Sequence, residues 1–377
     1  MPVDRLPEPD ADARAASATL CAFIAREIES RDNWISFARY MELALHAPRL
    51  GYYASGSTKL GAAGDFVTAP ELGSLFARTL ARQVAELLEP GDAVLEFGAG
   101  SGALAGAMRD ALAALGAAPD YLIIEPSAEL TERQRQRLGT GVRWLAALPE
   151  RFRGVVIANE VLDAMPAHAL TWTPQDILER GVCIDDGQLA WCERPATGAV
   201  RAAAQALPVA SEDRYESEIN LAARAWTRTL AERLERGAIF VVDYGFPERE
   251  YYHPQRAMGT LMCHYRHRAH ADPFFLPGLQ DITTHVDYSA VAKAAVDGGL
   301  DVLGYTNQAQ FLINCGITDL LAEVDATDLQ RYAPLAAQAQ MLLSPAEMGE
   351  LFKVIALGRG IERSLLGFTS GDRAHTL

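Results

Sequence analysis

The sequence has few cysteines and lacks any apolar run long enough to cross a membrane. Its five cysteines are an odd number, lie scattered and form no CxxC pair, so neither a disulfide framework nor a thiolate zinc site is indicated. A membrane helix needs roughly 18 or more apolar residues in succession. We therefore expect a cytoplasmic protein without a membrane span. Acids and prolines at the start replace the basic and apolar pattern of a secretory signal, and we expect a disordered tail over residues 1–15.

Positive charge is also in short supply. Lys and Arg total 34 against 49 Asp and Glu, which gives a net charge of −15 over 377 residues. Nucleic-acid binding draws most of its affinity from Lys and Arg, so a nucleic-acid substrate is disfavoured. Hydrophobic residues make up 49% and charged residues 22% of the chain, which is typical of a globular protein. The length predicts one large α/β domain with additions, or two domains.

The first part of the chain has a helical pattern. Between about residues 16 and 88, apolar residues recur at spacings of three and four, which predicts amphipathic helices. We assign residues 16–90 to a helical N-terminal cap. Within it lies a long loop rich in Gly, Ser and Thr that contains the sequence GDFVT. Loops longer than about 12 to 15 residues in compact domains are usually functional or disordered, and we favour a functional loop.

After Pro90 strands alternate with helices, which predicts a parallel sheet covered on both faces. We expect strands at 93–97, 121–125, 142–146, 154–159 and 238–245. A β-rich insertion at about 166–217 and a long polar loop at about 246–287 interrupt this pattern. The last strand, FKVIALG, resembles the final antiparallel strand of a class I methyltransferase sheet. The predicted fold class is therefore α/β, with a Rossmann-like class I sheet over residues 91–377.

A glycine-rich turn, Glu96-Phe97-Gly98-Ala99-Gly100-Ser101-Gly102, connects the first of these strands to a helix. Such a turn lies at the edge where doubly wound sheets bind ligands, and glycine lets the backbone approach an adenosine closely. The spacing of Gly98, Gly100 and Ala103 also fits an NAD-binding pattern, and a structural turn without a ligand is a third interpretation. Glu96 and the three alternate glycines favour S-adenosylmethionine. Glu125 ends the second strand, where it can accept hydrogen bonds from ribose hydroxyls in either cofactor.

Several motifs occur together in one order: GDFVT, LEFGAGSG, NEVLDAMP and DITTHVD. In this combination, and over nearly the whole chain, the sequence resembles the MidA family of methyltransferases, also described as the mitochondrial complex I assembly factor family. The resemblance implies a class I fold, S-adenosyl-L-methionine as cofactor and, for mitochondrial members, an arginine of a respiratory complex I subunit as substrate. It also implies that Asp65 and Thr68 contact the cofactor; the alternative for Asp65 is a turn residue that hydrogen-bonds its own backbone. Met262 and His264 depart from the Arg and Tyr more usual in the family.

Carboxylates follow two of the predicted strands. An arginine acceptor needs carboxylates to hold its guanidinium and to take its proton, and Glu160 and Asp163 lie just beyond the fourth strand. Asn159 is a candidate contact for the methionine ammonium of the cofactor, and Glu160 is an alternative for the same contact. Asp243 and Tyr244 end the fifth strand and are candidates for lining the substrate channel. The alternatives are a helix cap for Asp163 and core packing for Tyr244.

The segment HYRHRAHADP brings three histidines close together. Its spacing is not the HExxH pattern, and Arg266 and Arg268 would repel a cation, so we expect no metal site. We interpret the whole loop at about 246–287 as a mobile lid whose Asp281, His285 and Asp287 contact the substrate. The alternative for each histidine is an exposed surface position or ordinary hydrogen bonding in the core.

Four functions remain open from the sequence. The first is methylation of a protein substrate. The others are methylation of a small molecule at nitrogen or oxygen, a chaperone role in assembly with S-adenosylmethionine bound, and an NAD-dependent oxidoreductase.

Overall fold

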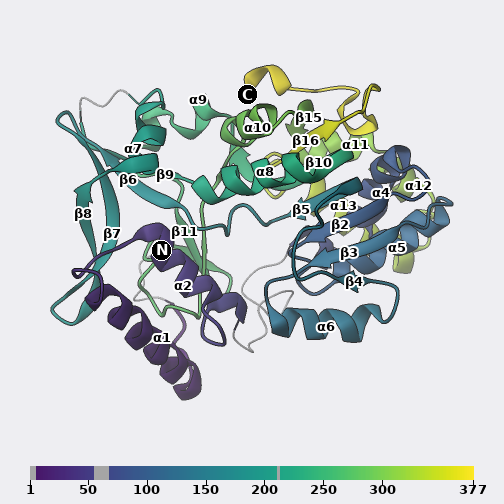
Figure 1. Cartoon of the computed structure of the whole chain (residues 1–377). Coiled ribbons are helices and arrows are strands. Elements are labelled where there is room, and N and C mark those ends of the chain that lie inside the picture. Colours follow the sequence, from purple (N-terminus) through teal and green to yellow (C-terminus); the bar gives the residue numbers. More distant parts are fainter. Residues whose placement is uncertain (1–5, 55–67, 210–212) are drawn as a thin grey trace. The chain divides into compact units, whose positions relative to one another are not determined.

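The computed structural model describes residues 6–54, 68–209 and 213–377 (Figure 1). The chain divides into two compact units. Unit 1 comprises Met1–Phe66, Asp163–Ala225 and Phe246–Asp287, and unit 2 comprises Val67–Leu162, Trp226–Gly245 and Tyr288–Leu377. The chain therefore passes between the two units several times, and each unit is built from segments that are far apart in the sequence.

Unit 2 contains a large sheet in the order β15-β16-β10-β5-β2-β3-β4. Strands β4, β3, β2, β5 and β10 run parallel, whereas β16 is antiparallel to β10 and β15. This order, with its single reversed strand, is the class I methyltransferase sheet, so the predicted fold class is confirmed. The strands are β2 (Ala93–Phe97), β3 (Asp120–Ile124), β4 (Arg143–Trp144), β5 (Phe152–Asn159), β10 (Leu234–Phe246), β15 (Asp301–Asn307) and β16 (Phe352–Arg359).

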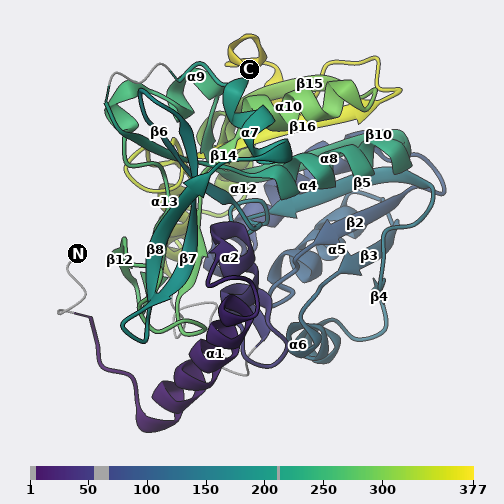
Figure 2. The ribbon, with the colours of Figure 1, turned by 60° about the vertical axis from the view of Figure 1, so that its left-hand side comes forward.

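Helices cover both faces of this sheet. Val155 and Ile157 lie at alternate positions of β5 and pack with residues of α4 and α5 in one core, because successive strand residues point to opposite faces. Figures 1 and 2 show α8 and α10 on the other face. The helices are α3 (Ala69–Leu72), α4 (Leu75–Leu87), α5 (Ala103–Ala114), α6 (Ala128–Leu138), α8 (Leu221–Arg233), α10 (Tyr288–Asp297), α11 (Gln308–Asn314), α12 (Ile317–Ala322) and α13 (Leu329–Leu343).

Unit 1 holds a second sheet in the order β1-β7-β6-β9, with β8 paired to β7. Most of it is the β-rich insertion expected from the sequence. Asp186 and Gly187 form the hairpin turn between β7 and β8, with positive φ angles of 47° and 77°. The two-residue strand β1 comes instead from the N-terminal segment, where only helices were expected. The elements are β1 (Ile35–Ser36), β6 (His168–Trp172), β7 (Ile177–Asp185), β8 (Gln188–Pro195), α7 (Gly198–Gln205) and β9 (Tyr215–Ile219).

Two helices, α1 (Ala11–Glu29) and α2 (Phe37–His46), belong to unit 1 and pack on its sheet. The Asp10 carboxylate accepts a hydrogen bond of 2.8 Å from the backbone N–H of Ala13 and thereby caps α1. Residues 11–15, which fall within the stretch expected to be a disordered tail, are therefore helical in the structure.

The stretch 246–287 has more regular structure than the loop expected from the sequence. It contains α9 (Glu248–Tyr251), η3 (Pro254–Arg256), β11 (Met262–Tyr265), β12 (Arg268–His270), β13 (Asp281–Thr283) and β14 (Val286–Asp287). Strands β12, β11 and β13 form a small sheet. Arg266 and His267, with φ angles of 46° and 60°, make the turn between β11 and β12. The histidine-rich segment is thus a tight hairpin.

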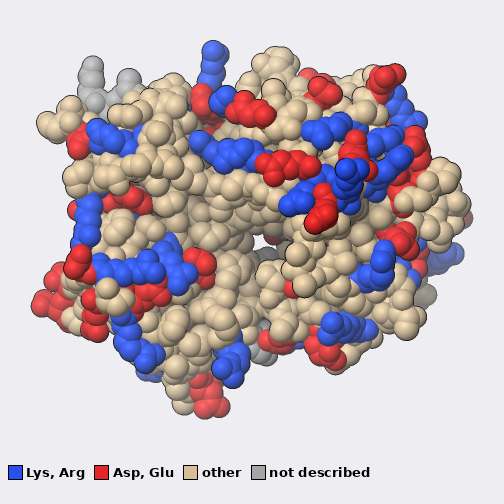
Figure 3. Space-filling model, in the orientation of Figure 1, with Lys and Arg blue, Asp and Glu red and all other residues tan. Residues whose placement is uncertain are grey.

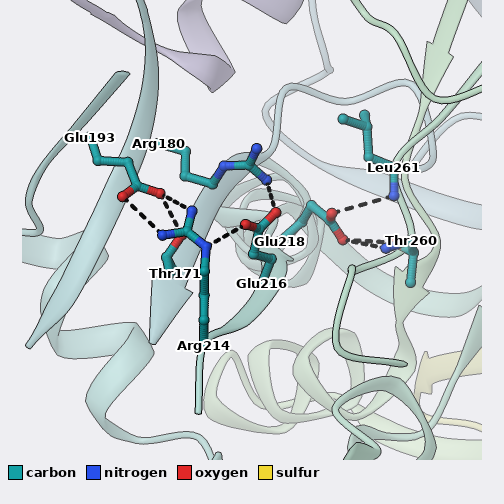
Figure 4. A network of polar contacts seen from close by, with 8 residues as sticks. All are labelled: Thr171, Arg180, Glu193, Arg214, Glu216, Glu218, Thr260 and Leu261. Atoms are coloured by element: carbon teal, nitrogen blue, oxygen red, sulfur yellow. Dashed lines mark hydrogen bonds and ion pairs between the residues drawn. The ribbon is translucent and has the colours of Figure 1, made fainter. Parts of the chain in front are cut away.

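A polar network joins β9 to the segment before β11 (Figure 4). The carboxylate of Glu218 accepts hydrogen bonds of 2.9 Å from both the N–H and the hydroxyl of Thr260, and one of 3.3 Å from the N–H of Leu261. On the same face of the sheet, Arg214 donates to Glu216 at 2.8 Å. Burial raises the pKa of Glu218 above its ordinary value, and the bonds from Thr260 oppose that rise. These contacts fix the start of β11 within unit 1.

Charged side chains of both signs are interspersed on the face shown in Figure 3. Among the described residues, no helix is both long and apolar enough to span a membrane.

Candidate active site

The glycine-rich turn between β2 and α5 has the backbone that the sequence predicted. Gly98, Gly100 and Gly102 have φ angles of 60°, 54° and 80°, a region that residues with a side chain rarely adopt. A Cβ atom on Gly98 would lie 3.2 Å from the Val161 side chain. The N–H of Gly98 donates to the carbonyl of Ile124 at 3.0 Å, which ties the turn to the end of β3. The turn therefore needs glycine for conformation and for space.

Glu96 lies beneath this turn and is almost completely buried. Its carboxylate accepts a hydrogen bond of 2.6 Å from the hydroxyl of Tyr121 on the neighbouring strand. The pKa of Glu96 is raised to about 7, mainly by burial and in smaller part by the nearby Glu125 carboxylate, while the bond from Tyr121 opposes the rise. This carboxyl group can therefore change its protonation state near neutral pH.

Glu125 follows β3 directly and lies beside the same turn. Its two carboxylate oxygens accept hydrogen bonds of 3.0 Å, one from the N–H of Ser127 and one from the amide of Gln134. Burial raises the pKa of Glu125, whereas these two bonds and one from the N–H of Gly100 lower it. The carboxylate is thus held in one orientation at the edge of the sheet.

Asn159 and Glu160 lie at the end of β5. Glu160 has a φ angle of 53°, which is strained for a residue with a side chain and is often found at functional sites. Asn159 donates to the Glu160 carboxylate at 3.1 Å. The Asn159 side-chain oxygen is buried and has no hydrogen-bond partner among the described residues. A buried oxygen of this kind is free to accept a hydrogen bond from a bound ligand.

Asp243, on β10, is completely buried and holds the chain that follows β5. One carboxylate oxygen accepts hydrogen bonds of 3.2 and 3.0 Å from the N–H groups of Val161 and Leu162. The other accepts a bond of 3.0 Å from the N–H of Tyr244, whose ring packs edge-on against Phe352 at 5.1 Å. These contacts place both residues at the same edge as the glycine turn.

Ser101, within the turn, is contacted by residues that the sequence analysis did not single out. Its hydroxyl donates to Glu71 of α3 and accepts a hydrogen bond of 2.9 Å from Arg137 of α6. Thr68 immediately precedes α3, and Asp65 lies outside the described residues. The only sequence signal for Glu71 was its position shortly after the GDFVT motif.

Asp163 and His285 belong to unit 1, whereas the glycine turn, Glu125 and Glu160 belong to unit 2. Asp163 is buried, and its carbonyl accepts a hydrogen bond of 3.0 Å from Thr284. The His285 N–H donates to the hydroxyl of Thr260 at 3.0 Å, and its ring stacks on Phe246 at 5.2 Å. Asp281 accepts bonds of 2.9 Å from the hydroxyl of Tyr53. The DITTHVD motif is therefore anchored within unit 1.

The site suits an adenosyl cofactor better than a metal ion. The three glycines leave room for an adenosine. The Glu125 carboxylate beside them would meet the ribose, and the Asn159 oxygen would meet the ammonium group. Among the described residues, no group of three or more His, Cys, Asp or Glu is arranged to hold a metal ion.

The strand order and the glycine turn together define a class I S-adenosylmethionine-dependent methyltransferase. Residues 75–306 match the model of a family described as "S-adenosyl-L-methionine-dependent methyltransferase", and the chain belongs to that family. Its cofactor is S-adenosylmethionine, and this assignment removes the NAD-dependent alternative.

Relatives extend over nearly the whole chain. A Burkholderia thailandensis protein, crystallised with S-adenosyl-homocysteine bound, is 52% identical and has a TM-score of 0.94, with coverage of 99% of this chain and 100% of that chain. The Danio rerio "Protein arginine methyltransferase NDUFAF7, mitochondrial" is 29% identical over 86% of this chain and 83% of its own length. The Homo sapiens protein of the same name is 28% identical over 86% and 80%.

The expected cytoplasmic location is contradicted by these comparisons. The curated relatives from Danio rerio and Homo sapiens are both named as mitochondrial proteins. The expectation rested on the scattered cysteines, which indicate a reducing environment but do not distinguish one such compartment from another.

Proposed function

We propose that this methyltransferase transfers a methyl group to an arginine side chain of a protein. The support comes from the curated relatives, whose names describe protein arginine methyltransferases and which match more than four fifths of this chain. The observation on the chain itself that carries the proposal is Glu160, a carboxylate in a strained backbone conformation at the end of β5, beside the glycine turn.

The cofactor contacts in this proposal come from the edge of the unit 2 sheet. Gly98, Gly100 and Gly102 cradle the adenosine, and Glu96 supports the turn from below. Glu125 accepts hydrogen bonds from the ribose hydroxyls, and Asn159 accepts one from the methionine ammonium. Asp65 and Thr68, in or next to the GDFVT motif, complete the set by resemblance to the family. When bound, S-adenosylmethionine supplies an electrophilic methyl group on a sulfonium.

Glu160 is the proposed catalytic carboxylate. A guanidinium has a pKa above 12, so a carboxylate must hold its fork and take the proton that leaves the attacking nitrogen. Asp243 acts as a positioning residue, because its carboxylate binds the backbone N–H groups that follow Glu160. Tyr244, Asp163 and His285 remain proposed contacts of the acceptor.

The acceptor protein proposed here is a subunit of respiratory complex I, as the family resemblance implies. A role in complex I assembly would follow if methylation prepares that subunit for incorporation.

The proposal is tested by incubating the purified protein with S-adenosylmethionine labelled in its methyl group and with an extract of cells that lack the protein. We expect one labelled polypeptide that yields methylarginine on acid hydrolysis. Glu160→Gln should lower the initial rate by about 100-fold or more, the usual minimum for loss of a general base. Glu150→Gln, which changes an exposed glutamate of unit 2, should leave the rate unchanged.

Three outcomes would contradict the proposal. Label confined to small metabolites would favour the small-molecule methyltransferase. Normal cofactor binding without any labelled product would favour the chaperone role. An unchanged rate in Glu160→Gln would mean that another group takes the proton.

A further inference from the structure

Gln134, on α6, is fully buried and connects three parts of the candidate site. Its side-chain nitrogen donates to the carbonyl of Gly100 at 2.9 Å and to the carboxylate of Glu125 at 3.0 Å. Its side-chain oxygen accepts a hydrogen bond of 2.8 Å from the indole N–H of Trp144. One amide therefore binds the glycine turn, the residue after β3 and the end of β4.

The chemistry of these neighbours fixes which way the amide points. A carbonyl and a carboxylate only accept hydrogen bonds, and an indole N–H only donates. The nitrogen must therefore face Gly100 and Glu125, and the oxygen must face Trp144. Glutamate at this position could not donate when ionised, methionine could neither donate nor accept well, and lysine could not accept. The site thus requires the donor and acceptor set of glutamine.

We propose that Gln134 is a positioning residue for the cofactor, which holds the Glu125 carboxylate ready for the ribose hydroxyls and ties it to the glycine turn. This inference rests on the proposed role of Glu125.

The amide of Gln134 also acts on the charge of Glu125. Burial raises the pKa of Glu125, and the bond from Gln134 is one of the contacts that lower it. Loss of that bond should therefore raise the pKa further. Charged or titratable groups on the neighbouring elements include Glu96 on β2 and Tyr121 on β3, which bind each other, and Arg109 on α5, which binds the carbonyl of Leu138. On α6, Glu129 pairs with Arg133, Glu132 binds Gln136, Arg137 binds Ser101, and Arg135 lies over the Trp144 ring. Arg143 on β4 pairs with Asp120 on β3.

The test is a titration with S-adenosyl-homocysteine by calorimetry between pH 5 and 8, performed on the full chain. Gln134→Met should weaken binding at neutral pH by roughly tenfold or more, as expected for loss of a hydrogen bond to a charged group. The pH at which affinity falls on acidification should move upward, because the ionised Glu125 is the binding form. Gln136→Met is the matched control on the same helix, since the Gln136 amide binds only the exposed Glu132 in the described contacts.

A second variant covers the case in which Gln134→Met fails to fold. Gln134→Glu preserves the shape but places a second carboxylate beside Glu125, and the two would share a proton. Its affinity should be weak at pH 8 and should improve as the pH falls, which is the opposite slope to that of Gln134→Met.

Several results would overturn the inference. Wild-type affinity in Gln134→Met would do so, and so would a loss that is equal at every pH, because a merely structural role leaves the pH profile in place. Unchanged affinity in Glu125→Gln would instead show that the proposed ribose contact is misplaced. The two failures are therefore distinguishable.

Discussion

At the scale of single residues, Gly100 is the most sensitive point of the cofactor site. Its φ angle of 54° is strongly unfavourable for a β-branched residue. Gly100→Val should therefore abolish binding of S-adenosyl-homocysteine, because the turn must change its backbone to accept the side chain. Titration calorimetry measures the loss, and circular dichroism checks that the fold remains. Unchanged affinity in a folded variant would mean that the cofactor lies elsewhere.

Glu96 should make stability depend on pH. Its pKa in the folded protein, about 7, lies above the ordinary value of 4.5, so the folded state binds the proton more tightly than the unfolded state. The contribution of Glu96 to the free energy of unfolding is therefore fully present below about pH 4.5 and is lost as the pH rises through 7.

We expect Glu96→Gln to remove this dependence. The variant should exceed the wild type by up to about 3 kcal/mol in the free energy of unfolding at pH 8, and the two should converge near pH 4.5. Denaturant unfolding across this range measures the difference, with the exposed Glu362→Gln as control. A constant difference at all pH values would show that burial does not raise this pKa.

At the scale of elements, β16 depends on a contact from α10. The buried hydroxyl of Tyr288 lies 2.9 Å from the carbonyl of Asp243 on β10 and 3.1 Å from that of Lys353 on β16. Tyr288→Phe should lower the free energy of unfolding by about 1–3 kcal/mol, since buried carbonyls lose a donor. Denaturant unfolding measures the loss. Tyr332→Phe, on α13, removes a hydroxyl outside this strand pair and should have little effect, so equal losses in both variants would contradict the assignment.

The strands and helices of unit 2 were largely predictable from the sequence. The strand 93–97 was predicted with its observed ends, because a short apolar run is bounded by Asp92 and by the glycine turn. The strand pattern was less informative for β1, which is only two residues long and pairs with Val182 and Gly181 far along the chain. Long-range pairing of this kind leaves no periodicity to detect. Strands β11, β12 and β13 were expected to be a loop for another reason: each is only three or four residues long, which is too short to show a clear alternation of apolar and polar residues.

The candidate site was predictable only where glycine spacing and strand ends marked it. Gln134 lies in the polar segment LTERQRQRL and gives no sign in the sequence that it is buried. Its contacts arise from the packing of α6 against the turn, which periodicity does not reveal. The predicted cofactor and catalytic residues, the domain boundaries and the lid over 246–287 stay predictions.

At the scale of the whole molecule, the cofactor product should stabilise the fold through unit 2, which contains the glycine turn. At 100 times its dissociation constant, S-adenosyl-homocysteine should add about 2.7 kcal/mol to the free energy of unfolding. Hydrogen exchange should slow at the turn and at the starts of α5 and α6, and far less in the β6, β7 and β9 sheet. The Gly100→Val variant should show no slowing of hydrogen exchange when S-adenosyl-homocysteine is added. Equal protection of both sheets in the wild type would argue against a cofactor site at the glycine turn.

The place of β16 within its sheet has a consequence for truncated variants. This strand lies between β10 and β15 and pairs with both, so β16 is an interior strand that joins β15 to the rest of the sheet. A variant that lacks residues 352–359 would therefore lose more than a border strand. It would leave the edges of β10 and β15 unpaired, and unpaired strand edges promote aggregation.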